Sequence, residues 1–224
     1  MATDTGFGKV KIFNDFLGAA VDETNDIVVG TENSGTQAVN IANGGWYRLV
    51  SGATSGNRVL YSTALNLSAA SGELIGEVRL TNVTAITLRA IYAGFIDVIA
   101  STVEMPIEMA AEVLTSTASD ACGFMYDTDS TNDTWYCVGV KADADATPVD
   151  SGIAPAAAGT SQTLRVVVNA DGKAEYFIDG KYVGSVTNAI TASTAVCFGV
   201  CLEARESAAK TLDSDYIYVE MGRT

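Results

Sequence analysis

The chain has 224 residues, 48% of them hydrophobic, and 27 acidic against 13 basic side chains give a formal net charge of −14. This length and apolar content exclude wholesale disorder and suit one all-β domain. Nucleic acids and anionic membranes are bound through lysine and arginine, and no basic cluster interrupts the acidic background, so we expect neither as a partner. Without an 18-residue apolar run or a basic segment preceding one, we expect no membrane span, no secretory signal and folding in a cytoplasm.

Strands are predicted where β-branched and aromatic residues alternate with polar ones between Gly, Asn, Asp and Ser. They are expected at 9–13, 37–41, 45–50, 58–62, 72–80, 85–93, 95–99, 121–126, 134–141, 163–169, 174–179, 182–186, 195–203 and 215–221. Residues 1–36 are predicted to form an N-terminal arm or loop with the first strand. This arm would belong to the same domain as a β-sandwich over 37–224. The polar, small residues of 14–36 and 141–162 indicate loops.

Two successive hairpins are predicted between 163 and 186. Apolar residues such as Leu164 and Val166 alternate there with other residues at a period of two, which is typical of a strand. Asp-Gly pairs at 171–172 and 179–180 favour tight turns because both residues tolerate positive φ. The fold class expected is therefore an all-β antiparallel sandwich with long loops and at most one short helix. The segment 104–114 fits either that helix or an irregular strand.

The order of these segments resembles the concanavalin-like lectin and glucanase sandwich. The resembling pieces are TLRVVV at 163–168, DGKAEYFIDG at 171–180, LDSDYIYV at 212–219, IFNDFL at 12–17, AGFID at 93–97 and DACGFMYD at 120–127. More narrowly, the sequence is similar to tailed-phage virion structural proteins of that fold. The resemblance implies a concanavalin-like jelly roll in a capsid decoration protein or another component of the virion surface.

Catalytic groups are scarce. Histidine is absent, which removes the most common general base, the Ser-His-Asp and Cys-His arrangements and histidine zinc sites. Some glucanases of the resembling fold carry a Glu-x-Asp-x-Glu strand. The nearest match here is Glu73 to Glu77, with Ile75 in place of the central aspartate. We expect a solvated face instead, with Glu77 near Arg79 or Arg89.

An oxygen-rich loop runs from Asp127 to Asp133 and could supply ligands for calcium. It lacks the glycine and the closing glutamate of an EF-hand, and Asp and Asn are ordinary turn residues. A plain β-turn is therefore favoured over a calcium site. The same interpretation applies to Asp143 and Asp145.

Four cysteines and two tryptophans complete the candidate residues: Cys122, Cys137, Cys197, Cys201, Trp46 and Trp135. The cysteine spacing is not a zinc signature, and buried thiols that act as small hydrophobic groups are expected. A Cys122–Cys137 disulfide across a hairpin is the alternative. The tryptophans are expected in the core, with a sugar-stacking platform as the alternative.

The sequence thus predicts no catalytic, cofactor-binding or metal-binding residue, no cofactor and no enzyme. We expect a viral structural protein, a capsid decoration protein located in the virion. Its partners would be the major capsid protein or other virion proteins and further copies of itself. The alternative function is a carbohydrate-binding, lectin-like module of a phage tail or fibre.

Overall fold

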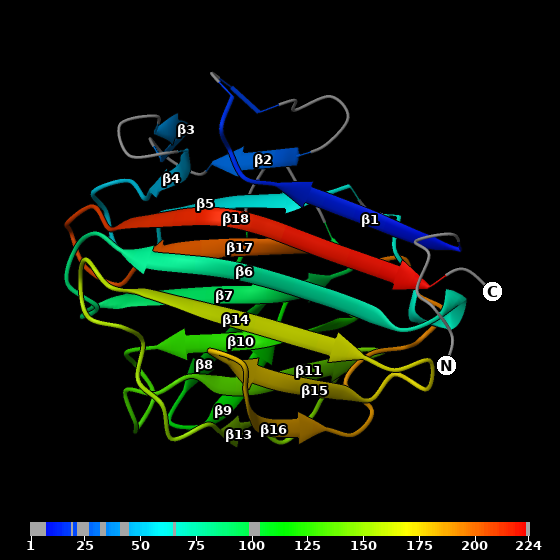
Figure 1. Cartoon of the computed structure of the whole chain (residues 1–224). Coiled ribbons are helices and arrows are strands. Elements are labelled where there is room, and N and C mark those ends of the chain that lie inside the picture. Colours follow the sequence, from blue (N-terminus) through cyan, green and yellow to red (C-terminus); the bar gives the residue numbers. More distant parts are fainter. Residues whose placement is uncertain are drawn as a thin grey trace.

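A computed structural model describes residues 8–18, 20–21, 27–31, 35–40, 45–64, 66–98 and 104–222. The described strands form two eight-stranded antiparallel sheets and one two-stranded hairpin. The sheets are stacked, with sheet A in front and sheet B behind in Figure 1. The all-β antiparallel sandwich predicted from the sequence is therefore confirmed. No helix among the described residues is both long and apolar enough to cross a bilayer.

Sheet A has the strand order β16-β15-β14-β6-β18-β4-β3, and β1 pairs with β18. Its strands are β1 (Lys9–Asn14), β3 (Thr36–Asn40), β4 (Trp46–Val50), β6 (Leu74–Asn82), β14 (Ser161–Val168), β15 (Ala174–Ile178), β16 (Lys181–Val186) and β18 (Thr211–Gly222). The two predicted hairpins are present, since β15 pairs with both β14 and β16. Asp179 and Gly180 at the second turn have φ of 50° and 77°, the conformation that an Asp-Gly pair tolerates.

Sheet B has the order β12-β11-β10-β7-β17-β5-β2, and β13 pairs with β11. Its strands are β2 (Ile27–Thr31), β5 (Arg58–Thr63), β7 (Arg89–Ile96), β10 (Ala121–Asp127), β11 (Tyr136–Lys141), β12 (Ala144–Asp145), β13 (Val149–Asp150) and β17 (Cys197–Ala204). A short 3₁₀ turn, η2 (Ala69–Ser71), precedes β6.

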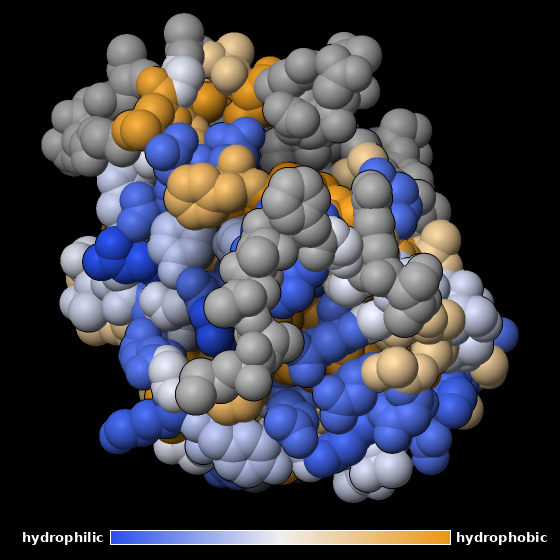
Figure 2. Space-filling view, turned by 45° about the vertical axis from the view of Figure 1, so that its right-hand side comes forward, coloured by the Kyte–Doolittle hydropathy of each residue, from blue (hydrophilic) through white to orange (hydrophobic). Residues whose placement is uncertain are grey.

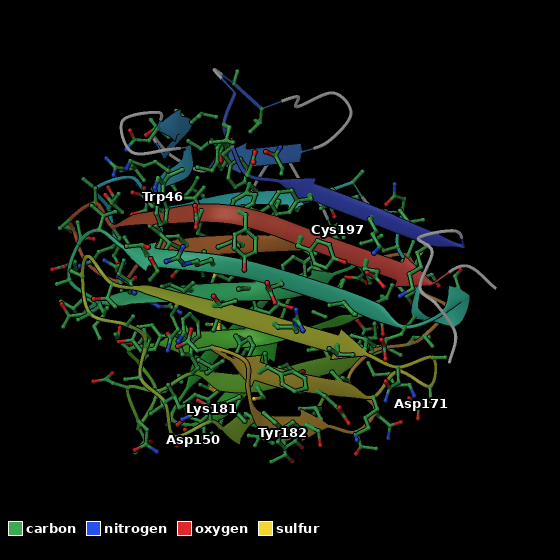
Figure 3. All side chains as sticks on the ribbon, in the orientation of Figure 1. Trp46, Asp150, Asp171, Lys181, Tyr182 and Cys197 are labelled. Carbon is green, nitrogen blue, oxygen red and sulfur yellow. The ribbon has the colours of Figure 1, made fainter. Side chains whose placement is uncertain are left out.

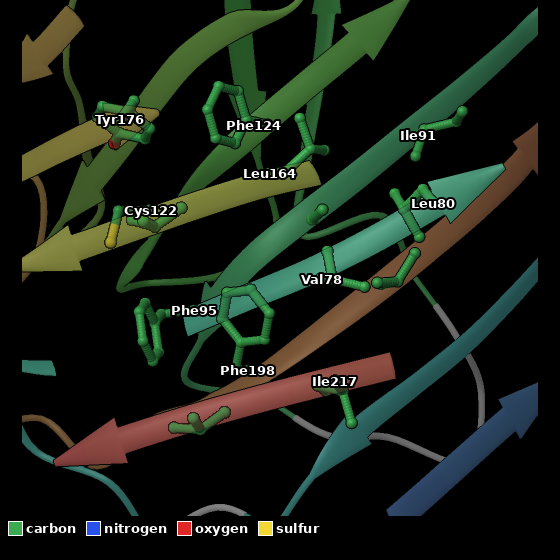
Figure 4. Packing of buried hydrophobic residues seen from close by; sticks show 14 of the residues in the cluster. Val78, Leu80, Ile91, Phe95, Cys122, Phe124, Leu164, Tyr176, Phe198 and Ile217 are labelled. Atoms are coloured by element: carbon green, nitrogen blue, oxygen red, sulfur yellow. The ribbon is translucent and has the colours of Figure 1, made fainter. Parts of the chain in front are cut away.

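The main core lies between the two sheets. On β6 the inward residues Leu74, Val78 and Leu80 are buried, while the alternate positions point outward, as period-two alternation predicts. Figure 4 shows Val78 and Leu80 close to Phe198 and Ile91 of sheet B. A side chain at Gly76 would meet the ring of Phe198 at 2.2 Å, so glycine there lets the ring lie against β6.

A second core lies on the outer face of sheet B. The hairpin β8 (Ile107–Ala110) and β9 (Val113–Ser116) packs over that face, and this explains why β7, β10 and β17 are buried on both sides. The buried residues of this layer include Met105, Ile107 and Met109. The segment 104–114, for which a helix or a strand was expected, is therefore a strand pair.

Several predicted boundaries differ from the structure. The predicted strands 85–93 and 95–99 are one strand, Arg89–Ile96, because Gly94 continues the ladder instead of ending it. Strand β2 falls in the predicted loop 14–36, and the loop 141–162 contains the two-residue strands β12 and β13. Residues 1–7, much of 19–44 and the strand ends at 41 and 99 lie outside the described residues.

Candidate functional site

A pocket opens on the outer face of sheet A beside Trp46, which Figure 3 labels on β4. Its volume is about 370 Å³. The lining residues are Asn40, Trp46, Arg48, Thr81, Val83, Gly159 and Asp213. The Trp46 ring is half-buried, so an apolar plane and several polar groups meet in one concave space. This volume and mixture are typical of small-molecule binding sites, which span about 300–1,000 Å³.

Arg48 and Asp213 form a paired fork in the wall of this pocket. The Arg48 Nε atom donates to Asp213 Oδ1 at 2.7 Å, and its Nη2 donates to Oδ2 at 2.7 Å. The hydrogen bond to Asp213 raises the pKa of Arg48, with burial opposing it. Such two-point pairs hold both side chains in one geometry. The pocket therefore presents fixed polar atoms beside the indole ring.

The local sequence explains how these groups meet. Alternation along β4 sends Tyr47 and Leu49 into the core and leaves Trp46 and Arg48 facing outward. Strand register then places Arg48, Asp213 and Thr81 side by side on β4, β18 and β6. Tyr47 stacks on Phe16 with ring centroids 5.1 Å apart, which anchors β4 from below.

A second cavity of about 610 Å³ lies between the β11–β12 turn and the end of β16. Its lining residues are Lys141, Ala144, Asp145, Ala146, Thr147, Ser185, Val186, Thr187 and Asn188. None of the described residues that line it is aromatic, so they do not offer the combination found at Trp46. Asp145 lies here, whereas Asp143 accepts a hydrogen bond from Ser119 at 2.5 Å.

A network of charged groups lies at the edge of the second core. Asp127 and Glu203 are fully buried, and Arg205 pairs with both of them. Arg58 also pairs with Glu203 and reaches Glu108 of the β8–β9 hairpin at 2.7 Å. Burial raises the pKa of Asp127 and of Glu203, while the paired arginines oppose this shift.

This network holds the hairpin onto sheet B. Besides the Glu108 ion pair, the backbone N–H of Met109 donates to Asp127 Oδ2 at 3.4 Å. Neither of the two cavities described above is lined by its residues. The β-turn expected at 127–133 therefore begins at a buried aspartate, Asp127, whose carboxylate is ion-paired with Arg205. Among the described residues, no group of three or more His, Cys, Asp or Glu side chains is placed to hold a metal ion.

The carboxylate pair that the sequence singled out is not assembled into a site. Glu77 accepts hydrogen bonds from Arg165 Nε and from the Tyr216 hydroxyl, each at 2.6 Å. Its partner is thus Arg165 and not the expected Arg79 or Arg89. Glu73 is exposed just before β6.

The cysteines are free and buried, as expected for small hydrophobic groups, and the alternative disulfide is not formed. Burial raises the pKa of Cys137 and of Cys197 to about 12. Trp135 is a core residue whose indole N–H donates to Gln162 at 2.8 Å. The core prediction was right for Trp135 and wrong for Trp46, which stands at the pocket.

The sequence did not predict the ion pairs Arg48–Asp213 and Asp127–Arg205. Arg48 and Asp213 are 165 positions apart, and Asp127 and Arg205 are 78 positions apart. No local pattern in the sequence reports such contacts, because strand order alone brings them together.

No protein-family model and no curated protein sequence matches this chain. Several solved structures match its fold. The endo-beta-1,4-glucuronan lyase of the fungus Trichoderma reesei matches with a TM-score of 0.64 at 14% identity, covering 95% of both chains. The carbohydrate recognition domain of Emp47p matches with a TM-score of 0.63 at 11% identity over 100% of both chains. Peanut lectin matches with a TM-score of 0.60 at 11% identity, covering 96% of this chain and 99% of the lectin.

One functional expectation is overturned by this comparison. The chain was predicted not to be an enzyme, yet a lyase shares its fold over nearly its whole length. The fold by itself therefore does not exclude catalysis by this chain. Identities of 11–14% show a shared fold and establish no activity. The chain has the concanavalin-like fold of lectins and glucanases.

Proposed function

We propose that this protein binds carbohydrate, and that a sugar ring lies on Trp46 in the pocket on the outer face of sheet A. The observation that carries the proposal is the half-buried indole beside the Arg48–Asp213 fork in a 370 Å³ pocket. An indole offers a large, rigid apolar plane, which suits the C–H face of a pyranose. The fork and Thr81 supply the hydrogen-bonding groups that fix its orientation.

The chemistry of the pocket favours a neutral sugar. Among the described residues that line it, the charged side chains are one arginine and one aspartate, and these pair with each other. An anionic sugar would have to compete with Asp213 for Arg48 in a chain whose net charge is −14. A neutral pyranose can accept and donate hydrogen bonds without breaking the pair.

The test is a glycan array followed by calorimetric titration with the best neutral oligosaccharide. Trp46→Ala should lower its affinity at least tenfold, which is about 1.4 kcal/mol. Val113→Ala, at an exposed apolar residue of the β8–β9 hairpin, is the matched control and should bind normally. Analysis of the recovered oligosaccharide shows whether it has been cleaved. Unchanged affinity in a folded Trp46→Ala variant would contradict this site.

A role as a capsid decoration protein, with a capsid protein as partner and the virion as location, stays a prediction from the sequence resemblance. The shared fold supports it no more than it supports other roles. Mass spectrometry of purified virions is its direct test, and absence of the protein from them would contradict it.

A further inference from the structure

A row of side chains crosses the outer face of sheet A at right angles to the strands. Strand register sets its order as Phe13, Tyr218, Glu77, Arg165, Phe177 and Tyr182. The row runs from β1 at one edge of the sheet to β16 at the other (Figure 1). Five interstrand spacings of about 4.8 Å make it about 24 Å long.

The ends of this row are aromatic and exposed. Phe13 is 61% exposed and Tyr182 is 58% exposed, values that are unusual for large apolar side chains. Tyr182 packs its ring edge-on against Phe177 with centroids 5.8 Å apart, and Figure 3 labels it at the edge of the sheet. The middle of the row is the ion pair in which Arg165 Nε lies 2.6 Å from Glu77 Oε2.

The chemistry of the row has the same order from either end: two aromatic residues, a charge pair, two aromatic residues. A twofold axis parallel to the strands and midway between β6 and β14 would reverse the row on a facing copy. Phe13 would then meet the partner's Tyr182, and Glu77 would meet the partner's Arg165. We infer that a second copy of this chain docks here, face to face and with twofold symmetry.

The neighbouring row is apolar at its two central positions. Glu220 and Glu175, which flank these positions and would face each other across the axis, are each ion-paired with a lysine of their own copy. Ile75 on β6 is the register partner of Val167 on β14, and both side chains are half-buried on the outer face. The twofold axis would place Ile75 on the partner's Val167. Two apolar residues therefore lie beside the charge pair at the centre of the proposed interface, where binding energy is concentrated.

Charge also favours this face for self-association. Lys9 and Lys11 pair with Glu220, Arg48 pairs with Asp213, Arg79 pairs with Asp215 and Arg165 pairs with Glu77. The outward charges of these strands are thus close to balanced, whereas the whole chain carries −14. Figure 2 shows hydrophilic and intermediate residues intermingled over much of this side of the molecule. Two copies can therefore meet through this face without the electrostatic repulsion expected between the acidic surfaces of the rest of the molecule.

The dimensions of the face suit a specific dimer. It is about 24 Å wide along the row and about 30 Å long along the nine residues of β6. The resulting area of about 700 Å² is close to the roughly 800 Å² per partner of a standard interface.

The proposed dimer brings the turn of the partner's β15–β16 hairpin close to the Trp46 pocket. That turn lies at the level of Arg79, since Asp179 bonds to Thr163 and Thr163 pairs with Arg79. Trp46 lies near the same level, because its neighbour Tyr47 pairs with Ser214 and Ser214 pairs with Leu80. Sugar binding is therefore also measured on the monomeric charge variants, in which no second copy can cover the pocket.

The experiment measures mass in solution by analytical ultracentrifugation of the wild type and charge variants. The wild type should be a dimer. Arg165→Glu places two carboxylates opposite each other across the axis, and Glu77→Arg places two arginines there, so each variant alone should be a monomer. Mixing the two variants should restore a heterodimer, because acidic centres then face basic ones. The ion pair inside each copy stays broken in the mixture, so only a contact between copies explains the recovery.

Arg79→Glu is the matched control. It breaks the Arg79–Asp215 ion pair on the same face, but the partner's neutral Thr163 would lie opposite it, so it should remain a dimer. A monomeric wild type at high micromolar concentration would overturn the inference. So would a mixture of the two folded variants that stays monomeric, or a dimer that all three single variants retain.

Discussion

At the scale of single residues, the pKa values of two buried carboxylates, Glu203 and Glu220, are shifted in opposite directions. Burial raises the pKa of Glu203 next to the second core. On the outer face of sheet A, the hydrogen bond from Lys9 lowers the pKa of Glu220, and the Tyr218 hydroxyl adds to this effect. A raised pKa stabilises the folded state when the group is protonated, and a lowered pKa stabilises it when the group is ionised.

These shifts predict opposite pH dependences for two glutamine variants. As pH falls from 7 through the raised pKa of Glu203, the wild type should gain stability relative to Glu203→Gln. As pH falls below the ordinary value of 4.5 and through the lowered pKa of Glu220, the wild type should lose stability relative to Glu220→Gln. Urea unfolding of all three proteins between pH 3 and pH 7 measures both differences in the free energy of unfolding. The titratable groups that the three proteins share contribute equally, so their contributions cancel in these differences. Differences that change in the same direction would contradict these environments.

At the scale of elements, the β8–β9 hairpin is the feature that distinguishes the outer face of sheet B. Ile107 and Met109 point into the second core, while Val113 is 66% exposed. The Arg58–Glu108 ion pair and the Met109–Asp127 hydrogen bond fasten the same hairpin to the sheet. Apolar packing and a buried charge network therefore act on one short element.

This arrangement predicts that alanine substitutions at two positions of the hairpin change the free energy of unfolding by very different amounts. Met109→Ala should lower the free energy of unfolding by about 2–5 kcal/mol, because it removes buried atoms and leaves a cavity. Val113→Ala should change it by less than about 0.5 kcal/mol, since that side chain faces solvent. Denaturant unfolding measures both. Equal small effects would mean that the hairpin contributes little to the fold.

Other element-level features were predictable to different extents. The two Asp-Gly hairpins of β14, β15 and β16 were fixed by local sequence, because alternation and turn residues act within a few positions. The β8–β9 pair was not, because Met105, Met109 and Val113 fit a helical spacing as well as a strand. Packing against sheet B decides between the two, and local sequence does not contain that information.

At the scale of the whole molecule, sheet B joins the two cores. Alternate residues of β7 belong to different cores: Ile91 and Phe95 face sheet A, whereas Tyr92 and Ile96 face the hairpin. Unfolding either layer would expose the other side of the same strands. We therefore expect the described residues to unfold as one cooperative unit.

This continuity predicts a single thermal unfolding transition. The calorimetric enthalpy should equal the van't Hoff enthalpy at one protein concentration, and near- and far-ultraviolet circular dichroism should change together. If the dimer inferred above forms, the midpoint should also rise with protein concentration. Two separate transitions would show that the hairpin layer and the sandwich unfold independently.

The sequence by itself determined the fold class, the Asp-Gly hairpins, the outward alternation of β6 and the burial of the cysteines. Each of these depends on interactions between neighbours in the chain or on the hydrophobicity of single residues. Only the tertiary structure decided the Trp46 pocket, the Asp127–Arg205 anchor and the self-complementary row across sheet A. Their members come from strands far apart in sequence, and antiparallel register alone aligns them. The same reason explains why Glu77 pairs with Arg165, a partner on the neighbouring strand that local spacing did not indicate.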